Sequence, residues 1–133
     1  MVLFFRFGRA DDPAMGALIV DDNEDMRSLV RLIVELEPDL DVVAEATDAC
    51  EAIEAWRIHR PDAIVLDQQL PSATGLDVAE VILREDPTTP IVLFSAYLDD
   101  AAVARAERLG VRACLGKDQV VRIPELLALH RRP

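Results

Sequence analysis

The chain has 133 residues, a length that predicts one domain able to bury a core without disulfides or a structural metal. Apolar residues make up 51% of it and charged residues 29%, which excludes a disordered, collagen-like or coiled-coil protein. Twenty-five acidic residues against fourteen basic ones give a net charge of −11, so we expect the general surface to bind neither nucleic acid nor an anionic membrane.

The start of the chain differs in composition from the rest. Residues 1–16 hold three of the four phenylalanines, followed by a structure-breaking stretch from Gly8 to Pro13. We interpret residues 1–16 as a flexible N-terminal extension and residues 17–133 as the domain. The alternative is an apolar arm that packs on the domain or on a partner.

Several observations predict a cytoplasmic location. Arg6 interrupts the first apolar run too early for a signal-peptide core, and no apolar run reaches membrane-spanning length. Cys50 and Cys114 lie in separate apolar contexts without C-x-x-C spacing. This pattern predicts two reduced, packed thiols.

From Ala17 onward, short apolar runs alternate with segments of helical periodicity. The predicted strands cover residues 17–20, 42–44, 63–66, 91–94 and 112–115. The predicted helices cover residues 23–37, 49–60, 76–85, 99–109 and about 124–130. The first helix is predicted to bury a stripe made of Met26, Leu29, Val30, Ile33 and Leu36.

Single residues support these boundaries. Asp48 is a helix N-cap candidate, Gly110 a C-cap candidate, and Pro124 suits a first helical turn. Glu45 in the second strand indicates a sheet edge. Five strand–helix units predict an α/β fold, a doubly wound five-stranded parallel sheet with helices on both faces and no second, output domain.

Polar residues follow four of the five predicted strands. Asp21 and Asp22 come after the first, Asp67 after the third, Ser95 after the fourth, and Lys117, the one lysine of the chain, after the fifth. Because the carboxyl ends of parallel strands meet at one edge of a sheet, we expect these side chains to converge.

Three converging carboxylates repel each other, and a hard cation relieves that repulsion. An oxygen-only site of this kind suits Mg²⁺ or Mn²⁺. With a lysine beside it, Asp67 is equipped to act as a nucleophile and form an aspartyl phosphate. The simpler alternative, solvated residues at strand ends, explains any one of these positions better than it explains the set.

The same residues resemble the receiver domains of response regulators in two-component signalling. The resemblance covers residues 17–130. It is carried by residues 18–23 (LIVDDN), 60–71 (RPDAIVLDQQLP) with Gly75, 94–96 (FSA) and 116–117 (GK). It implies the flavodoxin-like strand order 2-1-3-4-5.

The resemblance also implies a role for each site residue. Asp67 accepts a phosphoryl group from a phosphohistidine on a histidine kinase or phosphotransfer protein. Mg²⁺ is bound by Asp22, Asp67 and the backbone carbonyl of Gln69, with Asp21 assisting through water. Ser95 and Lys117 hold the phosphoryl oxygens, and Ser95 moves toward the phosphate as a switch.

Two positions depart from the family pattern. Cys114 stands where the family has an aromatic switch residue. Tyr97 is a nearby aromatic in sequence that could contribute to the same face, although surface packing is the simpler interpretation of its side chain. Asp118 stands where a proline usually follows the lysine, which favours a trans peptide bond there. Gln69 and Tyr97 occupy positions that tune phosphate lifetime in the family.

The resulting prediction is a single-domain response regulator that is not an enzyme beyond its own phosphorylation and dephosphorylation. It is expected to act on a downstream protein target. The alternative is a phosphorylation-independent interaction or dimerisation module. An aspartate-nucleophile phosphatase is disfavoured because Gln69 stands where such enzymes need a general acid. A nucleotide-binding domain is disfavoured because the first turn lacks a glycine-rich loop.

Overall fold

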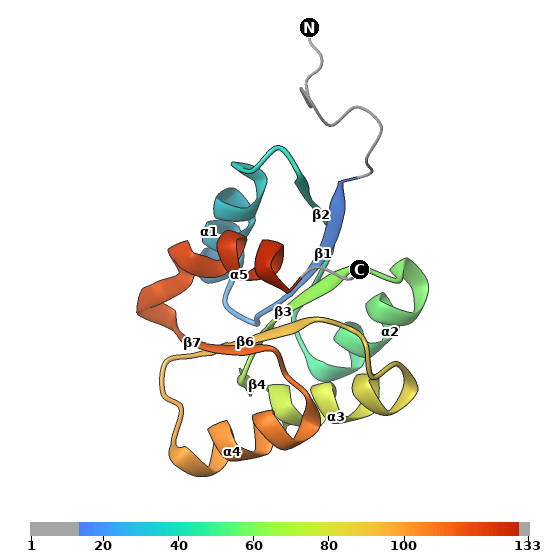
Figure 1. The fold of residues 1–133 in the computed structure, drawn as a ribbon, viewed down its shortest axis with the longest axis vertical. Helices are drawn as coiled ribbons and strands as arrows, with labels where there is room; N and C mark the ends of the chain where they lie inside the picture. The colour runs from blue at the N-terminus through green and yellow to red at the C-terminus, as the bar shows by residue number, and fades with distance from the viewer. Residues whose placement is uncertain (1–13, 131–133) are drawn as a thin grey trace, which may run out of the picture.

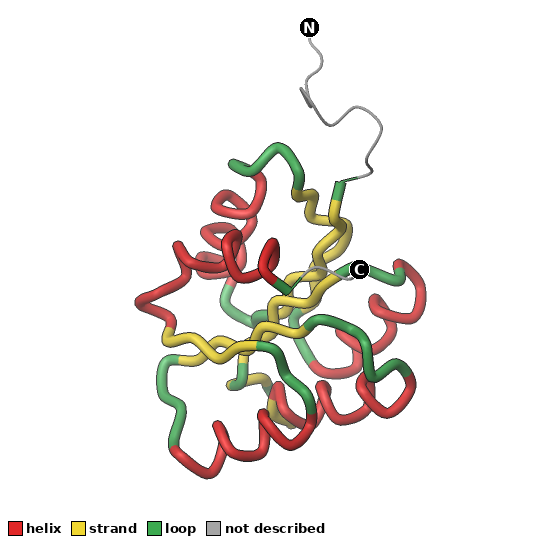
Figure 2. Tube along the Cα trace, viewed as in Figure 1, coloured by secondary structure: helices red, strands yellow, loops and turns green. Residues whose placement is uncertain are grey.

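The computed structural model describes residues 14–130 and shows a five-stranded parallel sheet between two helical layers (Figures 1 and 2). The strand order is β2-β1-β3-β6-β7. Counted along the sheet strands, this is the expected order 2-1-3-4-5. The strands are β1 (Met15–Val20), β2 (Leu40–Ala46), β3 (Ala63–Asp67), β6 (Ile91–Ser95) and β7 (Ala113–Gly116).

Five helices cover the sheet. They are α1 (Glu24–Glu35), α2 (Ala49–His59), α3 (Gly75–Glu85), α4 (Asp100–Leu109) and α5 (Ile123–Leu129). Two small elements were not predicted. One is an antiparallel pair, β4 (Gln69–Leu70) and β5 (Ala73–Thr74), and the other is a 3-10 helix at Lys117–Arg122 that leads into α5.

Alternation along the strands divides the core in two. In β3, Val65 packs with α1 and α5, whereas Ile64 and Leu66 pack with α2, α3 and α4. Trp56 and Phe94 are the largest fully buried side chains, one in each cluster. Burial on both faces explains why the strands read as continuous apolar runs.

Side-chain caps fix where four helices begin. Asn23, Asp48, Thr74 and Asp99 each accept a hydrogen bond from a backbone N–H in the first turn. Gly110 ends α4 with φ +95°, and Pro124 lies in the first turn of α5, both as predicted. The acidic strand β2 is at the sheet edge, also as predicted.

Two expectations about the first strand and helix need correction. Met15 and Gly16, predicted to belong to the extension, pair with Leu40 and Asp41 of β2 and are part of the sheet. The remaining extension, residues 1–13, lies outside the described residues. In α1 the buried residues are Val30 and Val34, not the whole predicted stripe.

The α1 difference has a geometric reason. Positions four apart turn toward the sheet together, so Val30 and Val34 are buried while Leu29 is 41% exposed. Leu36 is 72% exposed because it caps the helix after its last turn. Cys50 also differs from expectation, since it is exposed on α2, whereas Cys114 is half-buried. Among residues 14–130, no helix is long and apolar enough to cross a membrane.

Candidate functional site

Parallel pairing brings the predicted site residues to one edge of the sheet. Val20 is in register with Leu66, so Asp21 and Asp67 follow side by side at the ends of β1 and β3. Ser95 at the end of β6 pairs with Gly116 of β7, directly before Lys117. The sheet topology therefore places groups from four strands together.

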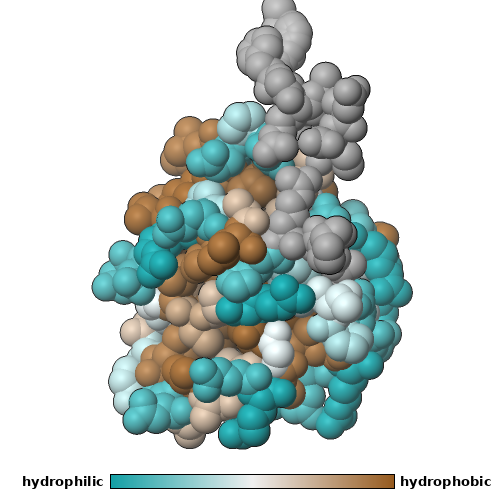
Figure 3. All heavy atoms as spheres, in the orientation of Figure 1, coloured by the Kyte–Doolittle hydropathy of each residue, from teal (hydrophilic) through white to brown (hydrophobic). Residues whose placement is uncertain are grey.

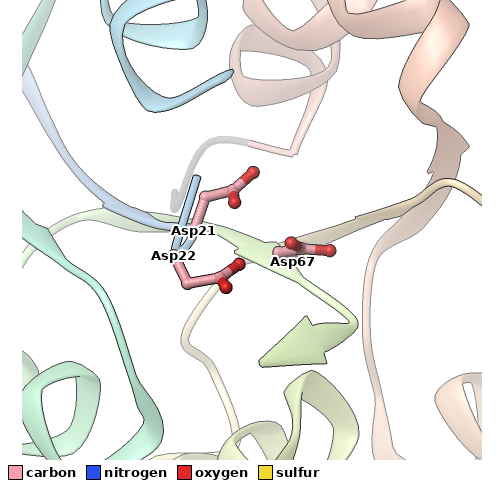
Figure 4. Close-up of side chains that lie close together, drawn as sticks. All are labelled: Asp21, Asp22 and Asp67. Carbon is pink, nitrogen blue, oxygen red and sulfur yellow. The ribbon is translucent and has the colours of Figure 1, made fainter. Parts of the chain in front are cut away.

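The three predicted carboxylates converge. Asp21, Asp22 and Asp67 each offer an oxygen within 4.8 Å of the others, with Asp21 and Asp22 leaving β1 beside Asp67 on β3 (Figure 4). Asp21 and Asp67 are buried and Asp22 is exposed, so the cluster is open to solvent on one side.

Lys117 lies against the two buried carboxylates. Its Nζ donates to Asp67 Oδ2 at 3.0 Å and is 3.5 Å from Asp21 Oδ2. The ammonium also sits 5.4 Å from the centre of the Phe94 ring. One lysine thus partly balances two buried negative charges and leaves the cluster with a net negative charge.

Burial and crowding shift the pKa values of this pair. Burial is the main cause that raises the pKa of Asp67 to about 6, and the charge of Asp21 adds to it, although Gln69 N–H and Lys117 act in the opposite direction. Burial lowers the pKa of Lys117, but the hydrogen bond and charge of Asp67 outweigh it and raise that pKa overall.

The donor set fits a hard divalent cation. Asp21 Oδ2 is buried and accepts no hydrogen bond within the described residues, although Lys117 is nearby. A buried carboxylate oxygen without a hydrogen bond is costly unless a cation supplies the missing interaction. Oxygen ligands from carboxylates beside a solvent-facing side suit Mg²⁺, which keeps several water ligands.

Backbone contacts hold the acidic residues in place. Asn23 N–H donates to Asp21 Oδ1 at 2.8 Å, and Gln69 N–H donates to Asp67 Oδ1 at 3.0 Å. Arg27 Nη1 donates to the Asp21 carbonyl oxygen at 3.0 Å while its Nε pairs with Glu45. These bonds fix the carboxylates before any ligand arrives.

Gly75 permits a close approach of the chain behind Asp67. A Cβ at this position would lie 2.3 Å from the backbone oxygen of Asp67. Gln68 links the segment after β3 to the start of α3, because its side-chain oxygen accepts a hydrogen bond from Leu76 N–H at 2.9 Å. Thr74 and Asp77 add a reciprocal capping box at the start of α3.

Ser95 is buried near the cluster and engages residues other than the carboxylates. Its Oγ lies 2.6 Å from Gln69 Oε1 and 2.7 Å from the Tyr97 carbonyl oxygen. The Tyr97 side chain is 72% exposed, so the contacts of Tyr97 with Ser95 are made by its backbone.

The two departures from the family pattern have distinct structural settings. Cys114 lies on β7 and packs against the cluster formed with α2, α3 and α4. Burial raises the pKa of its thiol. The bond after Lys117 is trans, as is every described peptide bond, and Asp118 Oδ1 folds back over Gly116.

Some functional contacts escaped prediction. The Thr74–Asp77 spacing is a readable capping-box signal that could have located the start of α3. No sequence signal marks the contact of Arg27 with the Asp21 carbonyl or that of Gln69 with Ser95, because each depends on how separate elements pack.

Comparison with known proteins agrees with this geometry. Residues 17–128 match the response regulator receiver domain family, and the chain belongs to that family. A protein-glutamate methylesterase/protein-glutamine glutaminase of Pyrococcus horikoshii is 38% identical over 101 residues, which cover 73% of this chain and 27% of that protein. The chain thus spans about a quarter of the length of this curated relative.

Solved structures show the same fold. A LuxR-family response regulator from Aurantimonas sp. SI85-9A1 has a TM-score of 0.79 at 30% identity and covers 89% of this chain and 88% of that chain. The response regulator domain of Thermotoga maritima CheB has a TM-score of 0.77 at 28% identity, and the match covers 88% of this chain and 93% of that chain. The sheet and helices are those of a receiver domain.

Proposed function

We propose that the chain is a phosphorylation-controlled signalling domain whose acceptor is Asp67, phosphorylated by a histidine kinase or a histidine phosphotransfer protein. The observation that carries the proposal is the 3.0 Å contact of Lys117 Nζ with Asp67 Oδ2 inside a cluster of three carboxylates. Family membership supports the same conclusion.

The chemistry follows from the charges at the site. A carboxylate oxygen of Asp67 attacks phosphorus, and the bond from phosphorus to the donor nitrogen breaks, leaving an acyl phosphate and a free histidine. Lys117 offsets the negative charge that arrives with the phosphoryl group. Attack of water on phosphorus later releases inorganic phosphate and restores the carboxylate.

Metal binding completes the set of positive charges. Asp21, Asp22, Asp67 and the backbone carbonyl of Gln69 would hold Mg²⁺ or Mn²⁺. When bound, the cation supplies charge neutralisation to the transferred group. Asn23 N–H and Gln69 N–H orient the carboxylates, so this chain's own backbone sets the positions of the ligands.

The output is a change in protein contacts. Ser95 would move toward the phosphoryl oxygens and alter the surface formed by α4, β7 and α5, with Cys114 and Tyr97 the residues at the family's switch positions. The domain is proposed to act in the cytoplasm.

The kinase side of the domain is proposed to be α1, beside the acidic cluster. Leu29, Leu32 and Leu36 are exposed on this helix, and hydrophobic residues gather where α1 and α5 lie in the surface view (Figure 3). An exposed apolar strip on a helix whose first turn directly follows Asp21 and Asp22 is suited to a helical partner.

Labelling with acetyl phosphate tests the acceptor. We expect Mg²⁺-dependent incorporation of one phosphoryl group into the protein and none into Asp67→Ala. Asp25→Ala, which removes an exposed carboxylate from the first turn of α1, is the matched control and should label like the unchanged protein. Equal labelling of Asp67→Ala would refute the assignment.

A phosphorylation-independent interaction or homodimerisation module is the second candidate, and the observation that favours it is Cys114 in place of an aromatic switch residue. Beryllofluoride with Mg²⁺ mimics the phosphorylated state and separates the two. Light scattering and partner affinity should change with beryllofluoride if the domain is a switch, and should stay constant if it is a constitutive module.

A further inference from the structure

We propose that the side-chain amide of Gln69 is a positioning group that holds the Ser95 hydroxyl in the resting state and competes with the phosphoryl group for it. The inference rests on the proposed function of Asp67. Its basis is the 2.6 Å contact between Ser95 Oγ and Gln69 Oε1.

The hydrogen-bonding capacity of Ser95 is already used. Its single hydroxyl proton lies between two acceptors, Gln69 Oε1 at 2.6 Å and the Tyr97 carbonyl oxygen at 2.7 Å. Its oxygen accepts from Tyr97 N–H at 3.1 Å. To donate to a phosphoryl oxygen, the hydroxyl has to give up these acceptors.

Gln69 contacts both groups that phosphorylation changes. Its backbone N–H donates to Asp67 Oδ1 at 3.0 Å, and its side chain binds Ser95. Gln68 and Gly75 anchor the same segment, since Gly75 N–H donates to the Gln68 carbonyl at 2.9 Å. A change at Asp67 is therefore transmitted by one residue to the switch hydroxyl.

The difference in burial between Ser95 and Gln69 favours replacement of the Gln69 acceptor by a phosphoryl oxygen. Ser95 is fully buried and needs a partner for its hydroxyl, whereas Gln69 is exposed and water can satisfy its amide. Once an anionic acceptor arrives, Ser95 gains a charge-assisted bond and Gln69 loses little. The Gln69 bond thus stabilises the resting state. Part of the free energy of phosphoryl binding is needed to break this bond, so the bond lowers the apparent affinity for the phosphoryl group.

Beryllofluoride affinity measures this contribution. Removal of one hydrogen bond that exists only in the resting state should tighten beryllofluoride binding by about three- to tenfold. We would titrate the full chain in saturating Mg²⁺ by calorimetry and compare Gln69→Ala with Gln69→Met, which keeps the length but not the amide. Gln119→Ala is the matched control, an exposed glutamine without a side-chain hydrogen bond among the described residues.

A double-mutant cycle separates this role from a general structural effect. In a Ser95→Ala background, loss of the Gln69 amide should change beryllofluoride affinity less than about twofold, because the coupled partner is gone. Mg²⁺ affinity without beryllofluoride is measured for every variant, so that beryllofluoride affinities are compared only at saturating Mg²⁺. The chain has one tyrosine, so 3-fluorotyrosine at Tyr97 gives a single ¹⁹F signal that should shift in Gln69→Ala toward its beryllofluoride-bound position.

The outcomes are distinct. If the wild-type protein binds beryllofluoride well and both Gln69 variants bind it equally or more weakly, the role of Gln69 is overturned and the proposed function stays intact. Tighter binding that persists in the Ser95→Ala background would also overturn it. Failure of the unchanged protein to bind beryllofluoride would overturn the proposed function and this inference together.

Discussion

At the scale of single residues, Asp67 carries an unfavourable charge in the metal-free protein. Its side chain is 1% exposed, and burial raises its pKa from 3.8 to about 6. Folding therefore favours the protonated form. The contribution of Asp67 protonation to the free energy of unfolding is complete below pH 3.8 and is lost as the pH rises through about 6.

Asp67→Asn should remove the destabilising effect of the buried Asp67 charge. In EDTA at pH 7.5 we expect the free energy of unfolding to rise by about 1–3 kcal/mol, and the gain should shrink toward zero near pH 4. Urea denaturation at several pH values measures it. Asp25→Asn, an exposed control at the start of α1, should lower stability slightly because it removes a favourable helix-dipole interaction. A gain that grows as the pH falls would contradict the assignment.

Lys117 separates metal binding from the response to phosphorylation. Lys117→Ala should retain Mg²⁺ binding, because the carboxylates and the Gln69 carbonyl remain. Beryllofluoride affinity should fall on the order of tenfold or more, because a charged hydrogen-bond donor is lost. Calorimetry with each ligand in turn measures both effects. Loss of Mg²⁺ binding with beryllofluoride binding retained would reverse the roles given to these residues.

At the scale of elements, two glycines provide a matched comparison. Gly75→Ala places a Cβ 2.3 Å from the Asp67 backbone oxygen, whereas Gly110→Ala meets nothing within 4 Å and is strained only by φ +95°. We expect losses of about 1–3 kcal/mol for Gly75→Ala and about 1 kcal/mol for Gly110→Ala.

The ligand response distinguishes these two variants. Only Gly75→Ala should also weaken Mg²⁺ and beryllofluoride binding, because its new methyl group displaces the segment that carries Asp67. Denaturation and calorimetry on the same samples test this. Weakened ligand binding in Gly110→Ala would show that general destabilisation explains both.

Sequence patterns predicted the main elements from local periodicity, and the convergence of the site from the topology that alternating strands and helices imply. Apolar runs identify β3 and β6, and parallel topology then places Asp67 and Ser95 at one edge. The β4–β5 pair is two residues per strand, too short for any periodicity. The Gln69–Ser95 bond depends on the position of that pair, so sequence alone could not predict it.

At the scale of the whole molecule, metal binding should stabilise the fold, because Asp21 and Asp67 are brought together only when β1 and β3 pair. At ten times its dissociation constant, Mg²⁺ should raise the free energy of unfolding by about 1.4 kcal/mol. Urea denaturation measures this increase, and a control in NaCl at the same ionic strength separates Mg²⁺ binding from general screening of the charges. Asp21→Asn should reduce the Mg²⁺ effect, and an undiminished effect would place the cation elsewhere.

The central position of the β1–β3 pair has a kinetic consequence. The chain between these strands contains α1, β2 and α2, so their pairing closes a long loop, and such closures tend to be slow. The carboxylates at the ends of both strands repel each other as the pair forms. Folding of this domain should therefore be fastest at mildly acidic pH, because protonation of Asp67 lowers the repulsion at the moment when the middle of the sheet is assembled.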